Sequence, residues 1–254
     1  IFASAILSGV ERECRKLKIA LAYSRIDADL ADLPEWYGEA GGLLLMGNMS
    51  RETVLGLREL GLPTVLIDNN LPTLGLDRVL TENIGAIYRA VEYLYGLGHR
   101  QIAFFHLTRP FTSLPERLLG YQQAVAELAL ESLVISSPTV QVSDISAALA
   151  QARAGGMVFT AIIAANDLTA ISVLHALQDA GLHVPDDVSL IGFDDLELAA
   201  VMRPALTTCR VHRELMGALS VQRLLARAAE PDAPPLALTI DAPLIARQCT
   251  RAVG

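Results

Sequence analysis

Polar side chains follow two apolar runs in the central part of the sequence. The run Ala161–Ala165 is followed directly by Asn166, and the run Val188–Phe193 is followed by Asp194. A carboxylate accepts hydrogen bonds and an amide both donates and accepts them, so this pair of residue types suits a small polar ligand. Because open parallel sheets bind ligands outside the carboxyl ends of their strands, we expect Asn166 and Asp194 at such a site.

A helix is predicted between these two runs, which we interpret as strands. Apolar residues recur there at the spacing of one helix face: Ala170, Ile171, Leu174 and Leu177. Gly181 stands where a helix end favours a left-handed residue, and Pro185 blocks any continuation. The segment therefore predicts a strand–helix–strand unit that presents both polar residues at strand ends.

A weaker copy of this unit occurs earlier in the chain. Gly42–Met46 is predicted as a strand, Arg51–Leu60 as a helix, and Thr64–Ile67 as a second strand that ends at Asp68. We interpret the two copies as a structural duplication that gives two similar α/β lobes, each with a carboxylate at a strand tip. A chance likeness between two such units stays open, because this pattern is common.

Composition limits the class of protein. The chain has 254 residues, of which 52% are hydrophobic and 5% aromatic, and its formal net charge is −8. This length can hold one large or two small domains, and the aliphatic composition fits an α/β protein. An acidic domain is a poor nucleic-acid binder by itself, since attraction to phosphates dominates that affinity. We interpret the few basic residues near the N-terminus as a solvated helix face: Arg12, Arg15, Lys16 and Lys18.

The positions of the cysteines and the lengths of the apolar segments indicate where in the cell the protein is located. The cysteines form neither a disulfide framework nor a metal-ligand spacing: Cys14, Cys209 and Cys249. We expect buried thiols and a reducing, cytoplasmic location. No apolar run reaches the length of about 18 residues that predicts a membrane-spanning helix. Ile1–Val10 also lacks the pattern of a signal peptide.

Signatures of catalysis and metal binding are absent from the sequence. It contains no GxSxG elbow, no phosphate loop with GK[ST], no HExxH and no GxGxxG. Adjacent carboxylates on an extended chain point to opposite sides, so the pairs Asp186-Asp187 and Asp194-Asp195 are not ready-made chelates. We interpret His99 as a structural hydrogen-bonding residue. The sequence thus predicts no enzyme, no metal site and no cofactor.

Strands and helices alternate along most of the chain, which predicts parallel sheets covered by helices on both faces. Further helices are expected at Phe2–Leu17, Gly85–Leu97, Glu116–Leu130, Ile145–Ala154 and Glu214–Ala229. Further strands or extended pieces are expected at Ile19–Tyr23, Ile102–His106, within Val134–Val142, and at Leu206–Val211, Leu236–Ile240 and Pro243–Ala246. The helix Glu214–Ala229 is apolar on more than one face, which fits burial by the core and a partner subunit, or by the core alone.

Several motifs resemble the LacI/GalR family of bacterial transcription regulators. The long central run NDLTAISVLHALQDAGLHVPDDVSLIGFDD is one, followed by RPALTTCR and PLIARQCT. Three earlier segments match as well: TEN at Thr81–Asn83, LGHRQIAFF at Leu97–Phe105 and RLLGY at Arg117–Tyr121. Together they cover nearly the whole chain in the expected order.

The resemblance implies a fold like that of a periplasmic binding protein, with two doubly wound α/β lobes joined by three crossovers. The N-terminal lobe is expected to contain residues 1–79 and 210–237, and the C-terminal lobe residues 81–208 and 238–254. No segment here matches the family's helix-turn-helix domain, its hinge helix or the strand that precedes the first helix. The resemblance therefore implies that operator DNA is bound only through the missing N-terminal domain of a parent protein.

The resemblance also implies a set of ligand-binding residues. Arg117 matches an arginine that binds ligand hydroxyl or carboxylate groups, and Asp194 matches an aspartate that accepts from sugar hydroxyls. The full expected set is Arg117, Asp194, Asn166, Asp68, Phe193, Ser113 and Phe111. Structural alternatives stay open: Asp194 as a turn residue, Asn166 as a helix cap, and Arg117 as the partner of a surface glutamate. Val211 stands where some sugar-binding members have a polar residue.

The function implied is that of a ligand-sensing and dimerisation core, which binds a sugar or related small metabolite in the cleft between the lobes. Ligand bound to both lobes would favour their closed form and thereby control DNA binding in the parent protein. A homodimer in the cytoplasm is expected. The alternatives are a periplasmic sugar-binding protein of a transporter and, less favoured by the motifs, an α/β enzyme.

Overall fold

The computed structural model describes residues 2–24, 38–71, 74–108 and 113–253. The chain forms two compact units: unit 1 comprises Ile1–Thr81 and His212–Ile240, and unit 2 comprises Glu82–Val211 and Asp241–Gly254. The chain therefore passes between the units three times. The expected lobe boundary at residue 237 is too early, because strand β9 (Ala237–Ile240) pairs in parallel with strand β3 (Asp77–Thr81) of unit 1.

Unit 1 is built on a parallel sheet with the strand order β1-β2-β3-β9. Its other elements are α1 (Phe2–Leu17), β1 (Leu43–Met46), α2 (Arg51–Arg58), β2 (Thr64–Ile67) and α8 (Arg213–Ala229). Buried leucines and a valine from the sheet, from α2 and from the segment between β2 and β3 fill its core: Leu43, Leu45, Val54, Leu57, Leu66 and Leu74. The earlier of the two predicted strand–helix–strand units is thus confirmed as β1-α2-β2.

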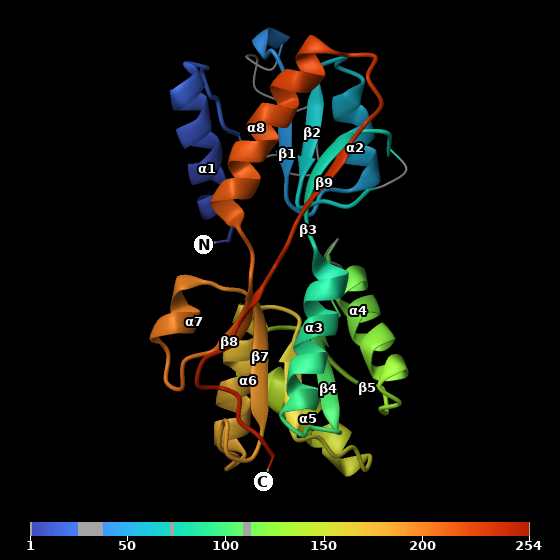
Figure 1. The fold of residues 1–254 in the computed structure, drawn as a ribbon, viewed down its shortest axis with the longest axis vertical. Coiled ribbons are helices and arrows are strands. Elements are labelled where there is room, and N and C mark those ends of the chain that lie inside the picture. The colour runs from blue at the N-terminus through green and yellow to red at the C-terminus, as the bar shows by residue number, and fades with distance from the viewer. Residues whose placement is uncertain (1, 25–37, 72–73, 109–112, 254) are drawn as a thin grey trace. The chain divides into compact units, whose positions relative to one another are not determined.

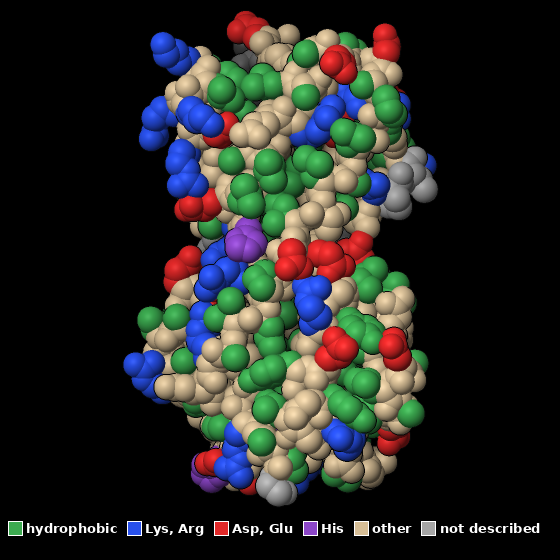
Figure 2. Space-filling view, in the orientation of Figure 1, with side chains coloured by type: hydrophobic (Ala, Val, Ile, Leu, Met, Phe, Trp, Pro, Cys, Tyr) green, Lys and Arg blue, Asp and Glu red, His purple; other side chains and the backbone are tan. Residues whose placement is uncertain are grey.

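Helices α1 and α8 lie side by side (Figure 1) and approach each other closely at two glycines. A Cβ atom at Gly9 would overlap the carbonyl of Glu214, and one at Gly217 would overlap the carbonyl of Ile6. Glycine is therefore needed at both positions for the helices to pack. Figure 2 shows Lys and Arg side chains gathered over α1. On α1, Arg12 forms an exposed ion pair with Glu214 of α8.

The strand predicted at Ile19–Tyr23 is wrong. These residues pair with no strand in the described part of the chain, and Ile19, Leu21 and Tyr23 are 37%, 41% and 65% exposed. The apolar pattern there is typical of a strand. However, a strand also needs a neighbour for its backbone N–H and C=O groups, which a local pattern cannot show.

Unit 2 is built on a larger sheet with the strand order β10-β8-β7-β6-β4-β5, in which β10 alone runs antiparallel to its neighbour. Its strands are β4 (Ile102–Leu107), β5 (Leu133–Ser137), β6 (Ala161–Ala164), β7 (Ser189–Asp194), β8 (Thr207–Arg210) and β10 (Leu244–Ile245). Its helices are α3 (Asn83–Gly96), α4 (Leu114–Glu127), α5 (Val142–Ala154), α6 (Asp167–Asp179) and α7 (Glu197–Val201).

Helices cover both faces of the unit 2 sheet, with α3 packed on α4 and α5 packed on α6 (Figure 1). β6 and β7 are buried along their whole length, as expected for strands covered on both sides. The predicted α/β fold with parallel-sheet lobes is confirmed. The central strand–helix–strand unit is β6-α6-β7, and its strand ends carry the polar residues of interest.

Candidate ligand-binding site

Three of the expected residues meet at the carboxyl end of the unit 2 sheet. Phe193 and Asp194 end β7, while Arg117 lies in the first turn of α4. The Arg117 guanidinium carbon lies 3.7 Å above the centroid of the Phe193 ring, and its Nη2 lies 3.6 Å from Oδ1 of Asp194. Nη1 of Arg117 donates to the carbonyl of Ala165, the residue after β6, at 2.6 Å.

Burial makes this group of charges costly to leave unpaired. Arg117 is 5% exposed and Asp194 is 8% exposed. The side chains attract each other, but 3.6 Å is longer than a direct hydrogen bond between a guanidinium and a carboxylate. A hydroxyl oxygen placed against both groups could accept from the guanidinium and donate to the carboxylate. The pair is therefore suited to hold a hydroxyl-bearing ligand.

The backbone at Asp194 is in a conformation that L-residues rarely adopt. Its φ is 115°, and the next residue, Asp195, has a φ of 51°. Such backbone strain is often found at functional sites, where the surrounding structure holds it in place. Here Asp195 provides that support, because Arg210 and Arg247 each donate to its carboxylate at 2.6 Å. Burial alone would raise the pKa of Asp195, but these two hydrogen bonds lower it.

Asn166 caps helix α6, which was the structural alternative to ligand binding that the sequence left open. Its Oδ1 accepts a hydrogen bond from the backbone N–H of Thr169 at 2.9 Å. The side chain is half-buried and lies next to Ala165, whose carbonyl binds Arg117. Its Nδ2 makes no hydrogen bond within the described part of the chain, so the cap leaves the amide donor available for a ligand.

Ser113, Asp68 and Phe111 are not among the residues that meet in this group, and Phe193 has a supporting role in it. Ser113 precedes α4, where its side chain is half-buried and forms no capping hydrogen bond. Asp68 follows β2 with a φ of 52° and belongs to unit 1. Phe111 lies outside the described residues. Phe193 is fully buried, with the guanidinium of Arg117 against its ring, so it supports that arginine.

Two polar residues of this region were not among those expected from the sequence. Nε of Arg117 donates to Oδ1 of Asn83 at 2.9 Å, and Nδ2 of Asn83 donates to Oε2 of Glu116 at 2.8 Å. Asn83 begins α3, while Glu116 and Arg117 lie in the first turn of α4. The sequence offered one indication of the importance of Asn83, because it belongs to the TEN segment that resembles a family motif.

Asp167 is a second group that the sequence analysis missed. It lies fully buried beside the site, where Oδ1 accepts from the Thr208 hydroxyl at 2.6 Å and Oδ2 accepts from the Leu196 N–H at 2.7 Å. Burial raises its pKa to about 6, although both hydrogen bonds act in the opposite direction. Asp167 thus holds the segment after β7 and strand β8 in place beneath Asp194 and Asp195.

Other groups with potential chemistry have structural roles. His99 is buried, with Nδ1 at 2.8 Å from the Thr160 hydroxyl and Nε2 at 3.1 Å from the Arg251 carbonyl. Burial lowers its pKa, so His99 is a neutral hydrogen-bonding residue, as interpreted from the sequence. Burial also raises the pKa of both Cys209 and Cys249 to about 12, which makes these thiols unreactive.

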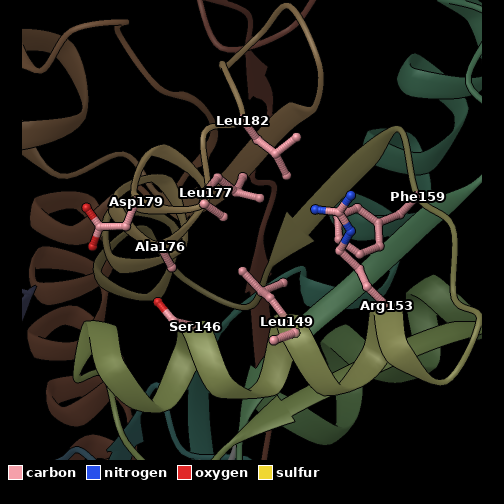
Figure 3. A pocket seen from close by; sticks show the side chains of 10 residues that line it. Ser146, Leu149, Arg153, Phe159, Ala176, Leu177, Asp179 and Leu182 are labelled. Carbon is pink, nitrogen blue, oxygen red and sulfur yellow. The ribbon is translucent and has the colours of Figure 1, made fainter.

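A pocket of about 270 Å³ lies elsewhere in unit 2, between α5 and α6 (Figure 3). Leu149 and Leu177 contribute to its apolar lining, and Arg153 and Asp179 are among its charged residues. Phe159, which lines it, precedes β6, so the pocket is at the amino end of the sheet. None of the described residues expected to bind ligand lines it.

The described residues contain neither a cluster of metal-ligating side chains nor a membrane-spanning helix. No group of three or more His, Cys, Asp or Glu side chains in that part of the chain could hold a metal ion. No helix there is both long enough and apolar enough to cross a membrane.

The chain is similar in sequence to a known family and to known proteins. A family model described as a periplasmic binding protein-like domain matches residues 91–250. The ribose operon repressor of Haemophilus influenzae is 28% identical over 258 residues, which are 97% of this chain and 76% of that repressor.

Solved structures show the same fold over nearly the whole chain. The transcriptional regulator CelR in complex with cellobiose superposes with a TM-score of 0.85 at 26% identity, over 98% of this chain and 79% of CelR. The Lac repressor dimer bound to operator and the anti-inducer ONPF superposes with a TM-score of 0.83 at 23% identity, over 98% of this chain and 89% of the other. At 23% identity, the similarity to the Lac repressor shows a shared fold and nothing beyond it.

Proposed function

The chain belongs to the LacI/GalR family of transcription regulators, as the periplasmic binding protein-like core that senses a small ligand, and we propose that its ligand is a neutral sugar or a related polyhydroxylated metabolite. We further propose that Arg117, Asp194 and Asn166 bind this ligand at the carboxyl end of the unit 2 sheet. The observation that carries the proposal is the buried Arg117–Asp194 pair, 3.6 Å apart.

The chemistry of the pair favours hydroxyl groups. A guanidinium only donates and a carboxylate only accepts, whereas a sugar hydroxyl does both at one oxygen. The Asn166 amide supplies a further donor beside them. Glu116 and Asp194 offset the positive charge of Arg117, so a neutral ligand fits the local charge better than a phosphate or a uronate does. The ribose operon repressor and the CelR–cellobiose complex are consistent with this class of ligand.

The relatives also favour a regulator over the alternative of a transport receptor, because they are repressors and regulators by name. We propose binding without turnover, in a cytoplasmic homodimer whose operator contacts come from another part of the parent protein. The Lac repressor that shares this fold was solved as a dimer on operator DNA. Sedimentation of the purified chain tests the dimer: a monomer at micromolar concentration would contradict it. Chromatography of any bound sugar after incubation tests turnover.

Calorimetry with ribose, cellobiose and glucose, set against glucuronate and glucose 6-phosphate, tests the ligand class. We expect heat of binding with at least one neutral sugar and none with the anions. Asp194→Asn and Arg117→Lys should weaken that binding roughly 10- to 100-fold, because each removes a charged hydrogen-bonding partner.

Unit 2 offers a matched control for each variant. Arg153→Lys and Asp179→Asn change the same residue types at the pocket between α5 and α6, at the other end of the sheet. Both controls should bind like the wild type. Equal affinity of Asp194→Asn, Arg117→Lys and the wild type would refute the assigned site, and binding of the anions alone would refute the neutral ligand.

A further inference from the structure

We propose that Asn83 is a positioning residue, whose side-chain amide holds the Arg117 guanidinium in the orientation needed to bind ligand. This inference rests on the proposed function. Asn83 is 4% exposed and begins helix α3. The residue before it, Glu82, caps the helix through a hydrogen bond from the Gly85 N–H to its Oε1, at 2.9 Å. This cap holds in place the backbone that carries Asn83.

The two charged neighbours of Asn83 settle which way its amide points. Arg117 can only donate and the Glu116 carboxylate can only accept, so a single amide orientation satisfies both. In that orientation Oδ1 accepts from Nε of Arg117 at 2.9 Å and Nδ2 donates to Glu116 at 2.8 Å. Asn83 thus connects a cation and an anion that are consecutive in sequence, and both of its polar groups are engaged.

Three contacts then define the plane of the guanidinium. Asn83 binds Nε, the carbonyl of Ala165 binds Nη1 at 2.6 Å, and the Phe193 ring lies against one face at 3.7 Å. A planar group held at two nitrogens has its third nitrogen placed as a consequence, and here Nη2 is directed towards Asp194. Loss of the Asn83 contact would let the guanidinium rotate, so the ligand would meet a less well-oriented donor.

A charge-exchange experiment separates this role from a merely structural one. Asn83→Asp keeps an acceptor for Nε but places a carboxylate against Glu116, so it should weaken sugar binding about tenfold, as should Asn83→Ala. Adding Glu116→Gln to Asn83→Asp restores a donor opposite the new carboxylate. We expect the double variant to bind within about threefold of the wild type. Gln123→Ala, on an exposed position of α4, is the control and should bind normally.

A second readout needs no ligand. In protein labelled with ¹⁵N-arginine, the Nε–H of Arg117 should exchange slowly with solvent in the wild type and in the double variant, and faster in Asn83→Ala. Unchanged exchange in Asn83→Ala would overturn the proposal, as would a folded double variant that binds no better than Asn83→Asp. If the exchange pattern holds while no neutral sugar binds the wild type, the proposed function fails and the positioning of Arg117 stands.

Discussion

Replacing Asp167 with asparagine is expected to make the protein more stable at neutral pH. The carboxylate of Asp167 is fully buried between the Thr208 hydroxyl and the Leu196 N–H, and burial raises its pKa to about 6 from an ordinary value of 3.8. Asparagine has nearly the same shape. Its oxygen can accept from Leu196, and its amide can donate to the Thr208 oxygen once that hydroxyl rotates.

The pKa difference sets the sign and the size of the effect. The folded state holds the proton of Asp167 more tightly than the unfolded chain does, so the favourable contribution is complete below about pH 4 and is lost as pH rises through 6. About two pKa units correspond to roughly 3 kcal/mol at neutral pH. Asp167→Asn carries no charge at either pH, so it should gain up to this amount relative to the wild type between pH 4 and 7.

Urea unfolding of both proteins at several pH values measures the difference directly. Every other titrating group is shared, so the gap between the two curves of free energy against pH reports Asp167 alone. Hydrogen exchange of the β7 amides gives the same comparison for unit 2 by itself. Asp179→Asn, at the exposed end of the same helix, should give a curve parallel to the wild type. Parallel curves for Asp167→Asn would refute the reasoning that burial controls the protonation of this carboxyl group.

Two further substitutions test the packing of each unit. Gly120→Ala should lower the melting temperature and weaken sugar binding, because a Cβ there overlaps the carbonyl of Ile84 and would displace α4, which carries the site arginine. Gly96→Ala meets open space and should do neither; equal melting temperatures for the two variants would contradict the clash. In unit 1, Asp77→Asn should cost roughly 1.5–3 kcal/mol of unfolding free energy, because it removes the charge of a buried carboxylate that accepts a hydrogen bond from the half-buried Arg227 at 2.6 Å. Burial would raise the pKa of Asp77, yet its hydrogen bonds lower it, so this stability is present at neutral pH and is lost as pH falls below about 4. Urea unfolding at pH 7 and pH 3 checks both statements, and an unchanged free energy in the variant would exclude the ion pair as a stabilising contact.

The strand ends of unit 2 could be predicted because their signals are local. An apolar run followed by Asn166 or by Asp194 identifies where a buried strand emerges, and this depends only on residues next to each other in sequence. The helix between them has its own start and stop signals. Arg117 was placed through the RLLGY motif, and the structure brings it to Asp194 across 77 positions of sequence. Local pattern alone contains nothing that would join these two residues.

The failures of prediction share the same cause. The strand expected at Ile19–Tyr23 has a suitable pattern but no strand to pair with in the described part of the chain. The contact between the Phe193 ring on β7 and the Arg117 guanidinium on α4 likewise joins segments that are distant in sequence. Burial raises the pKa of Asp167, and the hydroxyl that donates to it belongs to Thr208 on strand β8. Each outcome is decided by a contact between distant segments, which the order of residues does not show.

Residues close to the three points where the chain enters or leaves unit 2 form hydrogen bonds with elements of the proposed site. Asn83, next to the first boundary, binds Arg117. The N–H of Val211, the last residue before the second boundary, donates to the carbonyl of Asp194 at 3.4 Å. Asp241, the first residue after the third, accepts a hydrogen bond from an arginine of α3 at 2.5 Å. A coupling of about 1–3 kcal/mol, which is usual for allosteric proteins, needs only one or two such hydrogen bonds to change on ligand binding. Under the proposed function, these three hydrogen bonds connect the site to the segments that join the two units.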